Sequence, residues 1–147
     1  MKKTLITLLA ATLFWQVNAA ESIWLTDLPK AEALAKAENK IVLLDFTGSD
    51  WCGWCIKFKK EALDTAEFQA YAAKNVVLVE LDYPRKIAQS ADLKQANAAL
   101  KAKYKIEGFP TLVVLDKNGK EIGRQGGYEE GGAKAFIAKL EKFKNAK

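Results

Sequence analysis

Short runs of mostly apolar residues recur along the chain, at residues 23–25, 41–46, 76–82 and 111–115. Runs of this length that are rich in Ile, Val and Leu are typical of strands covered on both faces of a sheet. The run at 41–46 is interrupted only by Asp45 and is expected to be a central strand, whereas the shorter run at 23–25 is expected at an edge. The pattern therefore predicts a buried sheet.

Between these runs, apolar residues recur at steps of three and four, as on the buried face of a helix. The expected helices are residues 28–38 after an Asp27 cap, a stretch from Cys52, a restart at the capping-box residues 64–67, a stretch from Ser90, and residues 132–143. In the helix from Cys52, the spacing turns Cys55, Phe58 and Ala62 inward and leaves Cys52 at an exposed tip. The inward positions expected in the later helices are Leu93, Ala96, Leu100, Tyr104, Phe136, Ile137 and Leu140.

Asn118-Gly119 is a hairpin signal, so residues 120–125 are expected to pair antiparallel with the strand at 111–115. The order of elements is then β-α-β-α-β-α-β-β-α. Alternating strands and helices favour a parallel core, to which the late hairpin adds an antiparallel edge. The sequence thus predicts an α/β fold with a central mixed sheet flanked by helices on both faces.

The N-terminus has the pattern of a secretory signal. Lys2 and Lys3 precede an apolar stretch at residues 5–15, and Val17-Asn18-Ala19 presents small residues for cleavage after Ala19, with Ala20 as the alternative. A transmembrane anchor is disfavoured because the stretch is shorter than the roughly 20 residues that span a bilayer. We expect a signal peptide at 1–19, a single domain at 20–147, a periplasmic or secreted protein, and no stable membrane insertion after cleavage.

The charge pattern does not indicate a nucleic-acid partner. Loss of Lys2 and Lys3 with the signal lowers the formal net charge from +5 to +3. The remaining lysines are interspersed with acids, as in the Lys57-Phe58-Lys59-Lys60-Glu61 stretch. This is the pattern of a solvated helix face rather than a basic binding surface.

The only two cysteines, Cys52 and Cys55, are separated by two residues. A c-type haem attachment requires His at position 56, which is Ile, and a zinc site requires more ligands than two Cys in a chain without His. A purely structural disulfide closing so short a loop would gain little stability. Since Cys52 is expected at a helix N-terminus, which favours a thiolate, the pair predicts a thiol–disulfide exchange centre without metal or cofactor.

Trp51-Cys52-Gly53-Trp54-Cys55, preceded by Asp45-Phe46 and followed by Gly108-Phe109-Pro110-Thr111, resembles the signature of a secreted bacterial member of the thioredoxin family. The resemblance covers nearly all of the chain after residue 19 and implies the thioredoxin fold. Two positions depart from the family pattern. Trp54 stands where thioredoxin has Pro and disulfide isomerase has His, and Glu80 stands where many members place a Lys near the buried acid.

The resemblance also implies a role for each matching residue. Cys52 would be the attacking thiol, Cys55 the thiol that resolves the mixed disulfide, and Asp45 the buried acid that takes the proton of Cys55. Pro110 would be the cis-proline beside the disulfide, with the Phe109 backbone pairing with a substrate strand. The residues expected to contact substrate are Trp51, Gly53, Trp54, Phe109, Pro110 and Gly126.

The predicted function is that of an exported protein-disulfide reductase or isomerase, which acts on protein thiols and disulfides and depends on an unidentified upstream redox protein. A dedicated reductase of one partner, serving cytochrome c maturation or a peroxidase, is the nearer alternative. A non-catalytic client-binding module that uses the same apolar groove is the more distant one.

Overall fold

The computed structural model describes residues 23–146. The predicted signal peptide of residues 1–19, with its cleavage position, lies outside the described residues. The elements, in order, are β1 (Trp24–Leu25), α1 (Leu28–Glu38), β2 (Ile41–Thr47), α2 (Gly53–Phe58), the π-helical segment η1 (Lys59–Leu63), α3 (Ala66–Asn75), β3 (Val76–Asp82), α4 (Ala91–Lys103), β4 (Thr111–Leu115), β5 (Glu121–Gly126) and α5 (Gly132–Asn145).

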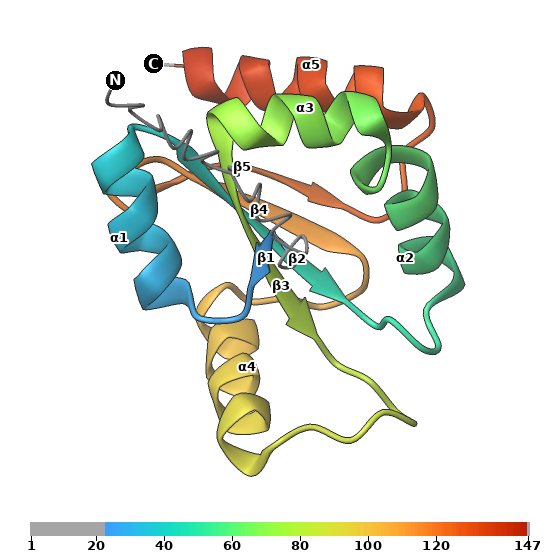
Figure 1. Cartoon of the computed structure of the whole chain (residues 1–147). Coiled ribbons are helices and arrows are strands. Elements are labelled where there is room, and N and C mark those ends of the chain that lie inside the picture. The colour runs from blue at the N-terminus through green and yellow to red at the C-terminus, as the bar shows by residue number, and fades with distance from the viewer. Residues whose placement is uncertain (1–22, 147) are drawn as a thin grey trace, which may run out of the picture.

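The strands form one sheet in the order β1-β3-β2-β4-β5 (Figure 1). β1 and β2 run parallel to β3, whereas β4 runs antiparallel to both β2 and β5. The predicted mixed sheet is confirmed, but its parallel part ends at β2, and β4 is already antiparallel. The reason is that the chain re-enters the sheet at the end where β2 finishes, with Thr111 opposite Phe46.

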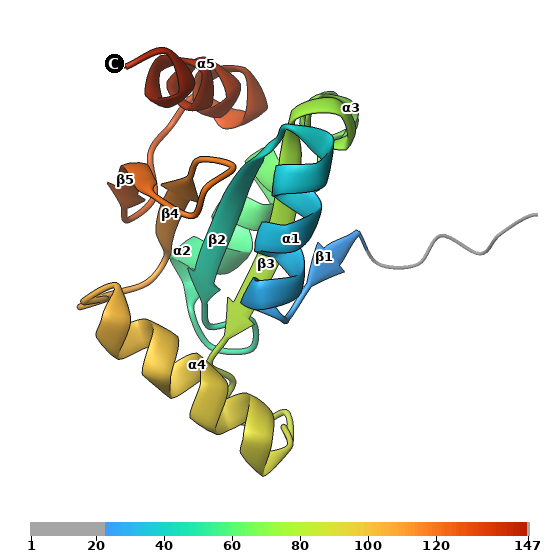
Figure 2. The same cartoon turned by 90° about the vertical axis from the view of Figure 1, so that its left-hand side faces the viewer.

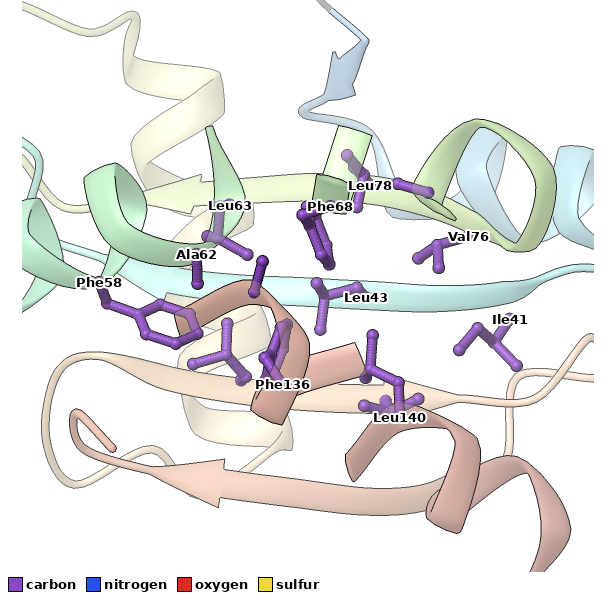
Figure 3. Packing of buried hydrophobic residues seen from close by; sticks show 14 residues of the cluster. Ile41, Leu43, Phe58, Ala62, Leu63, Phe68, Val76, Leu78, Phe136 and Leu140 are labelled. Atoms are coloured by element: carbon purple, nitrogen blue, oxygen red, sulfur yellow. The ribbon is translucent and has the colours of Figure 1, made fainter. Parts of the chain in front are cut away.

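Helices cover both faces of the sheet, as predicted, and each face has its own apolar core (Figure 2). On one face, α2, η1, α3 and α5 pack over the sheet through residues such as Phe58, Phe68, Phe136 and Leu140, drawn in Figure 3. On the other face, Leu28, Ala31 and Ala35 of α1 pack against alternate residues of the same strands. The sheet is therefore buried between two layers, which holds the carboxyl end of β2 in place.

Capping side chains fix where the helices begin. Asp27 accepts the Lys30 N–H at 2.8 Å, and Ser90 accepts the Leu93 N–H at 3.2 Å, as the sequence predicts. At α3 the N-cap is Thr65, which accepts the Phe68 N–H at 3.2 Å. The helix after the cysteines continues beyond Phe58 into η1, a wider turn that the sequence pattern did not indicate, and ends at Leu63 before this cap.

The inward face predicted for α4 is wrong in part. Ala96 is exposed, Leu93 and Leu100 are half-buried, and the buried residue of the helix is Asn97. Asn97 Nδ2 donates to the Asp82 carbonyl at 3.0 Å, and the Tyr83 hydroxyl donates to the Asn97 carbonyl at 2.7 Å. α4 thus contacts the end of β3 through Asn97, while Leu100 and Tyr104 of the predicted stripe pack in the core on the α1 face of the sheet.

The β4–β5 hairpin forms, but through a longer turn than the Asn-Gly dipeptide alone would give. The Gly119 N–H donates to the Asp116 carbonyl at 3.0 Å, and Gly119 has φ +80°, where its missing side chain removes the usual strain. Asp116 Oδ1 accepts the backbone N–H groups of Asn118 and Lys120. Among residues 23–146, no helix is long and apolar enough to cross a membrane.

Candidate active site

Cys52 lies at the N-terminus of α2, directly beyond the loop that leaves β2, and is disulfide-bonded to Cys55. Its side chain is the N-cap of the helix, because Cys52 Sγ accepts the Cys55 backbone N–H at 3.2 Å. An N–H aimed at sulfur, together with the positive end of the helix, stabilises negative charge on that sulfur. Once the bond is reduced, this is the environment of an activated thiolate.

Both cysteines are buried in the disulfide form, with Cys52 7% exposed and Cys55 3% exposed. The predicted exposed tip at Cys52 is therefore wrong for the oxidised protein. The cause is that Cys52 Sγ turns back onto the first turn of α2, where it meets both the Cys55 N–H and Cys55 Sγ.

Asp45 is buried on β2, on the face that also carries Ile41 and Leu43 and is covered by α2 and η1. Its Oδ1 accepts no hydrogen bond from any described residue. Burial, and to a lesser extent the neighbouring carboxylate of Glu80, its register partner on β3, raise the pKa of Asp45 to about 7. A carboxyl group that titrates near neutrality is suited to exchange a proton with a thiol.

Lys59, in η1, is a charged neighbour of this acid that the sequence reasoning missed. Its Nζ lies 2.8 Å from Oε1 of Glu80, and its charge acts to lower the pKa of Asp45. A basic group thus reaches the buried acid from the helix side, although Glu80 replaces the Lys that many family members carry on the strand. Because Lys59 follows Cys55 by four residues, helical spacing would have placed the two on one face.

Cys55, Lys59 and Glu80 line the same surface pocket, of about 260 Å³, together with Thr47, Ser49, Ile56, Lys60 and Asp64. The second cysteine and the charged pair beside Asp45 thus share one opening to solvent.

On one side of the disulfide, Trp51 and Phe109 meet edge to face, with ring centroids 5.8 Å apart. Trp51 Nε1 donates to the Tyr83 carbonyl at 2.8 Å. The Phe109–Pro110 peptide bond is cis, and the Pro110 carbonyl accepts the Gly127 N–H at 2.7 Å. Gly126 pairs with Thr111 across β4 and β5, which brings the end of β5 beside Pro110.

On the other side, Trp54 is 58% exposed and stacks on Tyr128, with centroids 5.2 Å apart. Lys57 Nζ lies 4.6 Å from the Tyr128 ring centroid, over this aromatic pair. Gly53 and Gly126 have open space where a side chain would stand. The residues predicted to contact substrate thus comprise an aromatic group on each side of the disulfide, plus glycines that leave the approach open.

The loop of residues 83–89 is hydrogen-bonded to the segment before Cys52. The sequence reasoning did not assign this loop to the site. The Asp50 carboxylate accepts the backbone N–H groups of Arg85, Lys86 and Ile87 at 2.6 to 3.2 Å. These bonds lower the pKa of Asp50, the largest effect coming from the Arg85 N–H. The residues next to Asp50 in the sequence, Ser49 and Trp51, do not indicate that its carboxylate binds a distant loop.

A Cys-x-x-Cys disulfide at a helix N-terminus, following the central strand of a mixed sheet and backed by a buried acid, defines a thiol–disulfide oxidoreductase. The chain belongs to the thioredoxin-like domain family, whose model matches residues 28–144. The resemblance identified from the sequence is thereby confirmed, and so is the thioredoxin fold.

Two curated relatives are Chlamydia pneumoniae proteins. "Disulfide bond reductase DsbH" is 45% identical over 112 residues, covering 75% of this chain and 67% of that protein. "Thioredoxin-related protein DsbJ" is 34% identical over 132 residues, but the matched region spans only 38% of its length. Among solved structures, "DsbH Oxidoreductase" matches with a TM-score of 0.79 and 35% identity, covering 96% of each chain.

Proposed function

We propose that the chain is an exported enzyme that reduces disulfides in protein substrates. The observation that carries this proposal is the Cys52–Cys55 disulfide with Cys52 as the helix N-cap. The direction of electron flow is supported by the similarity to a protein named as a disulfide bond reductase. Export is supported by the Lys2-Lys3, apolar and Val-x-Ala pattern at residues 1–19.

In the first step, the Cys52 thiolate attacks one sulfur of a substrate disulfide. The substrate S–S bond breaks, a bond forms between Cys52 Sγ and the attacked sulfur, and the other substrate sulfur leaves as a thiolate. The Cys55 N–H, which points at Cys52 Sγ, stabilises the thiolate before the attack.

In the second step, Cys55 attacks Cys52 Sγ, which restores the Cys52–Cys55 disulfide and releases the second substrate thiolate. Asp45 takes the proton of the Cys55 thiol, either directly or through a water molecule, and its pKa of about 7 allows this near neutral pH. Two electrons pass to the substrate in each cycle. A dithiol protein upstream must return them, and its identity is not specified by this site.

We propose that Trp51, Gly53, Trp54, Phe109, Pro110 and Gly126 contact the substrate polypeptide. Support comes from the exposed indole of Trp54, from the half-buried rings of Trp51 and Phe109 beside the disulfide, and from the open space at both glycines. Aromatic surfaces beside a reactive thiol suit unfolded or flexible protein segments.

Reduction of insulin by a dithiol donor tests the activity. The parent chain and Lys36→Gln, a change on the exposed side of α1, are expected to turn over insulin, whereas Cys52→Ser is not. Equal rates with and without Cys52 would reject catalysis and favour a client-binding module. N-terminal sequencing of periplasmic material tests export, with Ala20 or Glu21 expected as the first residue.

A further inference from the structure

Basic side chains lie on the aromatic groups that flank the disulfide. On the Trp51 side, the guanidinium carbon of Arg85 lies 3.8 Å from the Trp51 ring centroid. Lys101 Nζ lies 5.1 Å from the centroid of Phe109 and 5.7 Å from that of Tyr83. Trp51, Phe109 and Tyr83 contact one another in a row, with Arg85 on the Trp51 end and Lys101 over Phe109 and Tyr83. We call this cluster and its two cations the basic rim.

The basic rim is held in place by the fold. The Asp50 carboxylate binds the backbone of Arg85, Lys86 and Ile87, and Trp51 Nε1 binds the Tyr83 carbonyl. Arg85 is therefore anchored at its backbone and rests its guanidinium on Trp51, the residue directly before Cys52. A pre-positioned guanidinium loses less side-chain entropy when it binds a partner.

Neither cation of the basic rim is neutralised by an ion pair with residues 23–146. By contrast, Lys59 and Arg124 are paired with Glu80 and Glu121. Of the acids nearby, Asp50 is engaged by backbone N–H groups and Asp82 by the N–H and hydroxyl of Ser49. Glu107 and Lys101 line one surface pocket. Lys105 lines it as well, so two cations share this pocket with one acid.

The aromatic pair of Trp54 and Tyr128 also carries a cation, but it has a carboxylate bonded to it. Lys57 lies over Trp54 and Tyr128 there, but the Tyr128 hydroxyl donates to Oε2 of Glu61 at 2.6 Å, which places a carboxylate beside the cation. In the basic rim, by contrast, the Trp51 indole and the Tyr83 hydroxyl donate to backbone carbonyls, so no carboxylate of residues 23–146 is bonded to these rings.

We propose that the basic rim binds an Asp or Glu side chain of the substrate next to the cysteine under attack, so that the enzyme prefers disulfides in acidic segments. This specificity rests on the proposed reduction of protein disulfides. Arg85 presents a planar set of N–H donors that matches a carboxylate, and Lys101 adds a second positive charge. Since the guanidinium already lies against an indole, a bound carboxylate would replace water on its outer edge.

The test compares three disulfide-bonded peptides that differ only beside the cysteines, where they carry Glu, Gln or Lys. We expect kcat/KM to fall in the order Glu, Gln, Lys, with the Glu peptide favoured over the Gln peptide by about fivefold at low salt, as for an exposed ion pair. In 1 M salt, where the Debye length is about 3 Å, the ratio should approach one.

Variants assign the preference to the basic rim. Arg85→Gln and Lys101→Gln should each lower the Glu-to-Gln ratio, and the double variant should bring it to about one. Arg85→Lys, which keeps the charge but loses the planar donors, should lie between. Lys36→Gln, in the last turn of α1 at the other end of the sheet, is the control and should keep the parental ratio.

Equal kcat/KM for the three peptides, or a parental ratio in the double variant, would overturn the proposed specificity. Failure to reduce any of the peptides would reject the reductase function, and the specificity with it. The two failures are therefore distinguishable.

Discussion

The two cysteines of the site differ in their surroundings. Cys52 Sγ accepts a backbone N–H at the helix start, whereas Cys55 lines a pocket with Lys59 and Glu80, whose charges act on the buried Asp45. The first environment stabilises a thiolate, and the second provides groups that can accept or donate a proton. The roles proposed for them are therefore not interchangeable.

Cys55→Ser is expected to accumulate mixed disulfides with substrate, since Cys52 can still attack but nothing releases the product. Cys52→Ser should trap none. Non-reducing gel electrophoresis after incubation with a disulfide-containing protein measures both. Equal trapping by the two variants would show that the assigned order of attack is wrong.

Asp45 links the stability of the oxidised protein to pH. Its folded pKa of about 7 lies above its ordinary value of 3.8, so the folded state holds this proton more tightly than the unfolded chain. Stability from this group is complete below about pH 4 and is lost as the pH rises toward 7, because ionising a buried carboxyl is unfavourable.

Asp45→Asn should remove this dependence. Since one pKa unit corresponds to about 1.36 kcal/mol, the stability of the variant relative to the parent should rise by on the order of 4 kcal/mol between pH 4 and pH 8. Urea unfolding at the two pH values measures the change. A relative stability that stays constant would show that Asp45 titrates normally.

Trp54 stands between the two cysteines and adds no charge beside them. Strong disulfide donors hold their thiolate with a nearby cation, and this chain contains no His. The cations around the site lie on aromatic rings instead, Lys57 at 5.5 Å from the Trp54 centroid and Arg85 at 3.8 Å from the Trp51 centroid. We therefore expect a reduction potential at the thioredoxin end, roughly −270 to −200 mV.

Trp54→His should make the couple more oxidising, with each 30 mV corresponding to about 1.4 kcal/mol of extra stabilisation of the dithiol. Equilibration with glutathione measures both proteins. A parental value near −120 mV would identify a disulfide donor and contradict the proposed direction of electron flow.

At the scale of elements, the strands were the most predictable part. β3 and β4 have the predicted bounds, and β2 extends the predicted run by Thr47, because runs buried on both faces leave an unbroken apolar signal. α4 was predicted as an element, but its contact face only in part, since Leu100 and Tyr104 reach the core whereas Ala96 is exposed. Its key contact is polar, through Asn97, and periodicity of apolar residues contains no information on a side chain-to-carbonyl bond.

The candidate site was predictable where residues are adjacent in sequence, as in 51–55, and where the family resemblance supplied a distant position, as for Asp45 and Pro110. The loop of residues 83–89 was not predictable. Its attachment depends on one carboxylate meeting three backbone N–H groups more than thirty residues later, and backbone donors are the same at every non-proline position.

Asp50→Ala should release this loop. Hydrogen exchange of the Arg85, Lys86 and Ile87 amides is expected to accelerate, because each donates to the Asp50 carboxylate. Asp92→Ala, on exposed α4, is the matched control and should leave these amides unchanged. Unchanged exchange in Asp50→Ala would mean that the loop is held by other contacts.

At the scale of the molecule, the face that carries the active helix depends on α5. Phe136 contacts Phe58 at 5.1 Å and Phe68 at 5.7 Å between ring centroids, so it joins α5 to α2 and α3 (Figure 3). Phe58 is three residues beyond Cys55. The packing of the last helix therefore supports the turn that holds the cysteines.

Phe136→Ala should lower the free energy of unfolding by about 3–5 kcal/mol, since it removes a buried ring from a packed core. Leu34→Ala, at a side chain that is 39% exposed, should cost much less. Denaturant unfolding compares the two. Similar losses would show that the core of this face repacks around the missing ring.

Because the chain has only two cysteines, folding and reduction form a closed thermodynamic cycle with four states: folded or unfolded, disulfide or dithiol. The extra free energy needed to unfold the disulfide form, compared with the dithiol form, equals the extra free energy needed to reduce the pair in the folded rather than the unfolded chain. For two electrons, 30 mV corresponds to about 1.4 kcal/mol. Two denaturation curves, one for each redox form, therefore measure how far folding shifts the reduction potential of the cysteine pair. No redox buffer is needed for this measurement.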